Sequence, residues 1–89
     1  MIRVEKIDDT TFGVTVTSGT TTTHTVSVSE DYHHKLTGGD VSAESLVEKS
    51  FEFLLDREPN TSILRSFDLP VIGQYFPEYE RSIRKALGL

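Results

Sequence analysis

Apolar residues recur at helical spacing in one long segment of the chain, residues 41–59. Most charged positions of this segment fall on the opposite side of the expected helix, so the apolar side forms one wide face. Ser42 is a good N-cap, and Pro59 disfavours helical geometry at the residue before it. The pattern therefore predicts an amphipathic helix that begins after Ser42 and ends near Arg57. Its apolar face comprises Leu46, Val47, Phe51, Leu54 and Leu55, and Phe53 widens this face.

Apolar and polar positions alternate one by one in the first third of the chain. Segments 2–7, 11–17 and 22–29 follow this alternation, which predicts three strands. All large apolar residues of these segments except Ile7 occupy even positions. We therefore expect one apolar face, which the long helix covers. That face carries Ile2, Val4, Phe12, Val14, Val16, Val26 and Val28.

The same parity predicts the register of the strands. A slip of one residue would turn a whole strand face to the other side of the sheet. If the even positions share one face, each connecting loop must contain an odd number of residues, which predicts loops at 8–10 and 18–20. The result is an antiparallel meander with segment 11–17 in its centre. The expected partners are Val4 with Val14, Ile7 with Thr11, Phe12 with Val26 and Val14 with His24.

The remaining segments predict short helices. Ser29 can cap a helix over residues 30–36, although this segment is ambiguous, and two glycines then break the chain. A helix that holds Ile63, Leu64 and Phe67 is expected after a cap at residues 60–62. Asp68 can cap a further turn, and a last helix follows Pro77. The fold class is thus a single α+β domain over residues 1–89, a three-stranded antiparallel meander packed against one main helix, with C-terminal helical segments.

Composition narrows the functional classes. The chain has 89 residues, no cysteine and a net charge of −5, from 14 acidic and 9 basic residues. The acidic balance disfavours unselective binding to nucleic acid or to anionic lipid. No apolar run approaches the roughly 20 residues of a membrane span, and the start of the sequence lacks the apolar core of a signal peptide. We therefore expect a cytoplasmic protein without membrane contact.

One block of the chain carries a family resemblance. It reads FLL, then REP, then SILRSFDL and finally YFPEY, within residues 53–79. This block resembles one found in short prokaryotic proteins of no known activity, so the resemblance implies a prokaryotic, cytoplasmic protein and no particular chemistry. The plan of a meander followed by a helix is also similar to antitoxins of the HicB type. That architectural likeness implies an alternative function, a regulator that binds a toxin partner or nucleic acid.

Histidines are the first candidates for chemistry. His33 and His34 follow Asp31, and His24 lies on the third predicted strand. Imidazole and carboxylate groups suit zinc or nickel. However, consecutive residues of a helix point about 100° apart, and the chain offers no second group of ligands. Surface histidines are the commoner explanation, and we expect neither a metal nor a cofactor.

The arginines and the C-terminal helices are further candidates. Arg57 and Arg65 could hold an anion, but Arg57 can equally bond the free carbonyls at the end of the long helix, and Arg65 can pair with Asp56 or Asp68. Residues 63–87 could form a helix-turn-helix, although acidic residues lie where its recognition helix would meet the bases. No catalytic motif is present, so the sequence predicts a protein that is not an enzyme.

The third predicted strand offers a surface for protein contact. It carries no lysine, proline or charge before Glu30, and edges of that kind are usually protected. A loop or the C-terminal segment covers it, or another chain pairs with it. Tyr75, Phe76 and Tyr79 would add a second, aromatic surface, or their rings instead close the core. The sequence thus predicts a non-catalytic interaction or regulatory module, with a second copy or another protein as partner. The candidate surface comprises Thr23, Thr25, Ser27, Arg57, Arg65, Tyr75, Phe76 and Tyr79.

Overall fold

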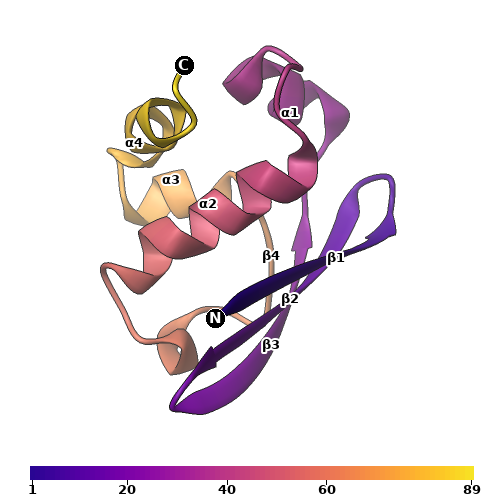
Figure 1. The fold of residues 1–89 in the computed structure, drawn as a ribbon. Coiled ribbons are helices and arrows are strands. Elements are labelled where there is room, and N and C mark those ends of the chain that lie inside the picture. The colour runs from indigo at the N-terminus through magenta and orange to yellow at the C-terminus, as the bar shows by residue number, and fades with distance from the viewer.

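A computed structural model describes residues 1–89 and shows a twisted sheet with helices packed on one face (Figure 1). The strand order is β1-β2-β3-β4; β1, β2 and β3 are antiparallel, and β4 runs parallel to β3. The fold is α+β, as the sequence predicts. The elements in chain order are β1 (Ile2–Asp8), β2 (Thr11–Ser18), β3 (Thr20–Ser27), α1 (Glu30–Thr37), α2 (Ala43–Leu55), a 3₁₀ turn (Asn60–Ser62), β4 (Ser66–Asp68), α3 (Val71–Tyr75) and α4 (Tyr79–Ala86).

The core forms where the even-numbered face of the sheet meets α2. Five even-numbered apolar residues of the sheet side are buried, and Ile2 and Val4 pack half-buried at the margin. The predicted face of α2 is also buried, apart from the half-buried Leu55. Both predictions are confirmed, because alternate sheet positions and helical spacing each place their apolar residues on one side. The five are Phe12, Val14, Val16, Val26 and Val28.

Helix α2 is buried on two sides, which explains its wide apolar face. The ring of Phe51 lies 5.3 Å from that of His24 on β3. The ring of Phe53, by contrast, lies 5.3 Å from Tyr79 and 5.9 Å from Phe76, on the side of α3 and α4. Figure 1 shows α2 running between the sheet and these two C-terminal helices. The helix therefore needs apolar residues beyond one stripe.

Side-chain caps begin the two N-terminal helices. The Ser42 hydroxyl accepts a hydrogen bond from the Ser45 N–H at 3.1 Å, and the Ser29 hydroxyl accepts one from the Tyr32 N–H at 3.1 Å. Each cap satisfies a backbone donor that has no partner within its helix. Helix α1 ends at Thr37, and Gly38 follows it with a φ of 73°, which is easily reached only without a side chain. Helix α2 ends at Leu55, two residues before the predicted Arg57.

The register is confirmed except at the β1–β2 turn. Val4 pairs with Val14, and Val14 pairs with His24, as expected. The predicted pair of Ile7 with Thr11 is wrong, because Asp8 pairs with Thr11 and a bulge leaves Ile7 without a partner. Strand β3 also begins and ends two residues before the predicted 22–29.

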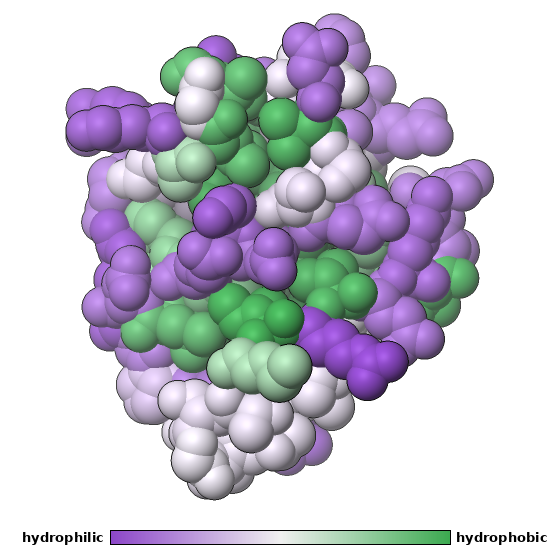
Figure 2. All heavy atoms as spheres, viewed as in Figure 1, coloured by the Kyte–Doolittle hydropathy of each residue, from purple (hydrophilic) through white to green (hydrophobic).

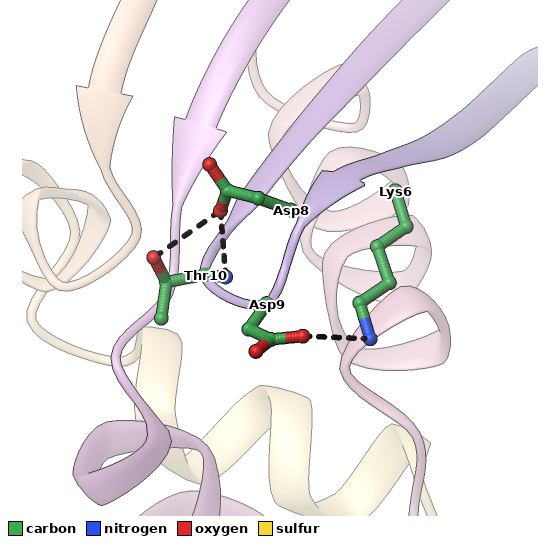
Figure 3. Close-up of polar contacts among 4 residues, drawn as sticks. All are labelled: Lys6, Asp8, Asp9 and Thr10. Carbon is green, nitrogen blue, oxygen red and sulfur yellow. Dashed lines mark hydrogen bonds and ion pairs between the residues drawn. The ribbon is translucent and has the colours of Figure 1, made fainter.

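A carboxylate closes the β1–β2 turn and accounts for that bulge. An Asp8 carboxylate oxygen accepts from the Thr10 N–H at 2.9 Å, and the Lys6 ammonium lies 3.7 Å from the Asp9 carboxylate (Figure 3). Aspartate commonly bonds the backbone two residues ahead in this way. Hydrogen bonds from the Thr10 backbone and the Thr11 hydroxyl hold the pKa of the Asp8 carboxyl below its usual range.

The turn gives a pH-dependent prediction. Because the Asp8 pKa is lower in the folded state than in the unfolded state, its stabilisation is complete above the unfolded value of 3.8. That stabilisation is lost as pH falls through the lower, folded value. Urea midpoints measured from about pH 5 to pH 2 should therefore fall less in Asp8→Asn than in the wild type. Asp9→Asn, which lacks the backbone bond, should keep the wild-type acid response; equal curves for all three proteins would contradict this role.

Strand β4 replaces a predicted helix. The Thr25 N–H donates to the Arg65 carbonyl at 2.7 Å, and the Leu69 N–H donates to the Ser27 carbonyl at 2.9 Å. The helix expected over Ile63, Leu64 and Phe67 is therefore wrong, and so is the sheet of only three strands. The unpaired edge of β3 offers backbone partners that a short, exposed helix could not match. Asp68 caps no helix; instead its carboxylate accepts from the Ser27 hydroxyl.

Candidate interaction groove

An open apolar groove lies between the end of α2, the segment that leads into β4, and α3. Its volume is about 200 Å³, and eight of its ten lining residues are hydrophobic. We call it the α3 groove. Its floor is formed by the buried residues Leu54, Ile63 and Ile72. Most of its lining belongs to the FLL–REP–SILRSFDL–YFPEY block within residues 53–79.

Local features of the sequence position the segments that form the walls of the groove. Pro59 follows α2 and leads into the 3₁₀ turn, which reverses the chain towards the sheet. The pairing of β4 with β3 then holds Phe67 against α2, where its ring lies 6.1 Å from Phe51. Helix α3 has only five residues, because Pro70 begins it and Pro77 follows it closely. The groove is thus a consequence of β4, which the sequence did not predict.

Large apolar side chains stand exposed at the rim. Tyr75 is 67% exposed and Leu64 is 48% exposed, and both line the groove. Exposed aromatic residues beside a concave apolar surface are typical of binding sites. Glu58 is the one charged residue of the lining, and none of the three ion pairs of the chain includes it. The groove therefore combines an apolar floor with one free carboxylate.

Arg57 connects the end of α2 with the start of α4. Its guanidinium donates to the Phe53 carbonyl at 3.0 Å, lies 3.6 Å above the Phe53 ring, and approaches the Glu78 carboxylate at 3.4 Å. The structural explanation of Arg57 is thus confirmed. Arg65 instead forms no ion pair with Asp56 or Asp68, which corrects that expectation. It lines a separate polar hollow of about 320 Å³ beside the first half of β3.

The three aromatic candidates have different roles. Tyr75 is exposed and Phe76 is half-buried at the groove, so both remain available to a partner. Tyr79 is fully buried, and its hydroxyl lies 2.6 Å from the Ser50 hydroxyl. Burial raises the pKa of the Tyr79 phenol. Its place in the interaction surface is therefore corrected: Tyr79 belongs to the core.

The histidines do not share a site. His24 is buried, and its ring nitrogens bond the Leu64 carbonyl at 2.8 Å and the Thr22 hydroxyl at 2.9 Å. The ring of His33 bonds the Val41 carbonyl. No group of three or more histidine, aspartate or glutamate residues is arranged to hold a metal ion.

Strand β4 alters two of the candidate surfaces considered from the sequence. Thr25 and Ser27 use their outward backbone groups to pair with it, so the expected free edge of β3 is closed there. Thr23 lies beyond the end of β4. The helix-turn-helix over residues 63–87 also lacks its first helix, because Ser66–Asp68 is a strand.

Comparison with protein-family models, with curated proteins and with solved structures found no match. None of the helices has the length and apolar character that a membrane crossing requires.

Proposed function

We propose that this chain is a non-catalytic protein-interaction module that binds one large apolar side chain of a partner protein in the α3 groove. The observation that carries the proposal is the combination of a small apolar hollow with exposed Tyr75 and Leu64 at its rim. Buried apolar anchors of this kind supply most of the binding energy of protein interfaces.

The size of the groove favours a side chain over a metabolite. Its volume of about 200 Å³ lies below the roughly 300–1,000 Å³ of most small-molecule sites. It is close to the roughly 150 Å³ of an apolar cavity that accepts a single benzene ring. A single ring or branched aliphatic group from a partner therefore fits this space.

The charge of the groove favours a basic partner. Glu58 supplies the one charge of the lining, and the whole chain carries a net charge of −5. Electrostatic complementarity selects partners more than it raises raw affinity. We expect the preferred anchor to stand next to a lysine or an arginine.

Two blocked dipeptides test this proposal. Amide chemical shifts should change around Leu54, Ile63 and Ile72 when acetyl-Phe-Arg-amide is added, and less so with acetyl-Phe-Glu-amide. The preference for the basic dipeptide should be about two- to fivefold, as for a solvent-accessible ion pair, and should vanish in Glu58→Gln. Shifts spread over the whole surface, or none, would overturn the proposal.

A filled groove provides the matched control. Ser62 is exposed and lines the groove, so Ser62→Phe should place a ring in it and abolish the shifts without unfolding the protein. Thr61→Phe adds the same ring at the neighbouring exposed position, outside the groove, and should bind like the wild type. If both variants lose binding, or both keep it, the dipeptide does not occupy the α3 groove.

A further inference from the structure

Strand β1 is an open edge of the sheet. The Thr17 N–H donates to the Met1 carbonyl at 2.9 Å, and the Met1 amine donates to the Thr17 carbonyl at 2.8 Å. Antiparallel pairs alternate, so the backbone groups of odd residues in β1 face β2. The backbone N–H and C=O groups of Ile2, Val4 and Lys6 then face outwards, and no strand lies on that side. Such a row of donors and acceptors pairs with another chain unless something blocks it.

The surface along this edge is partly apolar. Ile7 is 60% exposed and Met1 is 89% exposed, while Ile2 and Val4 are half-buried. In the space-filling view, green apolar and purple hydrophilic side chains lie next to one another in the area where Figure 1 draws β1 (Figure 2). Arg3 and Glu5 are both exposed. The edge therefore presents hydrogen-bonding groups, apolar area and two opposite charges together.

We propose that a second copy of this chain pairs with β1 in antiparallel orientation, with Val4 opposite the partner's Val4. In this register Arg3 lies opposite the partner's Glu5, and Glu5 opposite the partner's Arg3. The exposed Ile7 lies opposite the partner's Met1. The segment from Met1 to Ile7 is thus complementary to itself, as a two-fold interface requires.

Charge selects this register over its neighbours. Even residues carry the free backbone groups, so alternative registers differ by two residues. One such slip places Arg3 opposite the partner's Arg3, and the other places Glu5 opposite the partner's Glu5. Like charges directly opposite each other destabilise a strand pair. Charges on an edge usually prevent pairing, but here the order of their signs favours pairing with a second copy.

The pairing would produce one continuous sheet of eight strands, because four strands come from each protomer. Paired residues share a face of the sheet, so both copies of α2 lie on the same side. The proposal is independent of the α3 groove, which lies at the opposite edge of the sheet, beside β4.

Charge reversal tests the proposed dimer. Sedimentation equilibrium should show wild-type dimers whose population rises with concentration. R3E or E5R places like charges twice across the interface and should raise the dimer dissociation constant by about tenfold or more. The double variant R3E/E5R restores both opposite-charge pairs and should return to the wild-type constant. Circular dichroism should show an unchanged fold, because both side chains are exposed.

Mixing the two single variants gives the sharpest readout. An equimolar mixture of R3E and E5R brings opposite charges together at both positions, so it should form heterodimers at wild-type affinity. Ser62→Phe should dimerise normally, which separates this test from that of the groove. A wild-type chain that stays monomeric, a dimer that neither reversal weakens, or a mixture that fails to recover would each overturn the proposal. If β1 instead paired with an extended peptide from another protein, the wild-type chain alone would stay monomeric.

Discussion

Replacing Phe51 with alanine is expected to lower the free energy of unfolding by about 3–5 kcal/mol. Phe51 is fully buried in α2, and its ring contacts His24 on β3 and Phe67 on β4. Truncation would leave a cavity at the point where the helix meets the two strands. A domain of this size has about 5–15 kcal/mol of total stability, so the variant should retain little of it. Urea denaturation followed by circular dichroism measures this loss.

The neighbouring Glu52 supplies the control for this prediction. It is exposed on the same helix, and its carboxylate makes only a surface ion pair with Lys49 at 3.4 Å. Glu52→Ala should therefore change the stability by no more than about 0.5 kcal/mol. A cost below about 1 kcal/mol for Phe51→Ala would mean that α2 does not cover the sheet in this way.

Replacing Tyr79 with alanine should cost a similar amount, about 3–5 kcal/mol. Tyr79 is fully buried at the start of α4, and its ring lies 5.3 Å from that of Phe53. It is the largest side chain that joins the C-terminal helices to α2. Its loss should release α4 from α2 and lower the urea midpoint together with the α-helical signal.

Phenylalanine at this position separates packing from hydrogen bonding. Tyr79→Phe keeps the ring and removes only the bond to the Ser50 hydroxyl, which still donates to the Leu46 carbonyl at 2.7 Å. We therefore expect a loss of about 1 kcal/mol. Equal losses for Tyr79→Phe and Tyr79→Ala would show that the buried bond, rather than the ring, connects the two helices.

Local patterns explain what could be predicted from the sequence. The even-numbered sheet face and the helix after Ser42 depend on periodicity and on caps within a few residues of each other. Both features can therefore be predicted from the local sequence. The bulge at Ile7 escaped prediction because it depends on a side-chain bond of Asp8 within the turn. The odd or even position of a residue contains no information about such a bond.

Strand β4 could not be predicted because its partner lies about forty residues earlier in the sequence, as the pair of Thr25 with Ser66 shows. The spacing of Ile63, Leu64 and Phe67 favours a helix as strongly as a strand. One signal was present, since Ile63, Phe67 and Leu69 are all odd-numbered, are all apolar and all turn inwards in the structure. A period of two over so short a segment is weak unless a free edge is known to lie nearby.

The candidate site was only partly predictable for the same reason. Tyr75 and Phe76 were identified from their aromatic character, and both line the α3 groove. Tyr79 has the same character, but its position on the inner face of α4 buries it. The place of Glu58 in the groove could not be predicted from the sequence, because it depends on β4, which brings Ile63 and Phe67 beside Glu58.

Amide hydrogen exchange tests the central claim most directly, namely that the chain closes the edge of β3 with its own residues 65–69. The amides of Thr25 and Leu69 donate to the Arg65 and Ser27 carbonyls. The amide of Thr23 faces the same edge beyond the end of β4 and provides the unpaired reference. The amides of Thr25 and Leu69 should exchange at least about 100-fold more slowly than the amide of Thr23. Equally fast exchange at Thr25 and Thr23 would contradict the pairing, and with it the origin of the α3 groove.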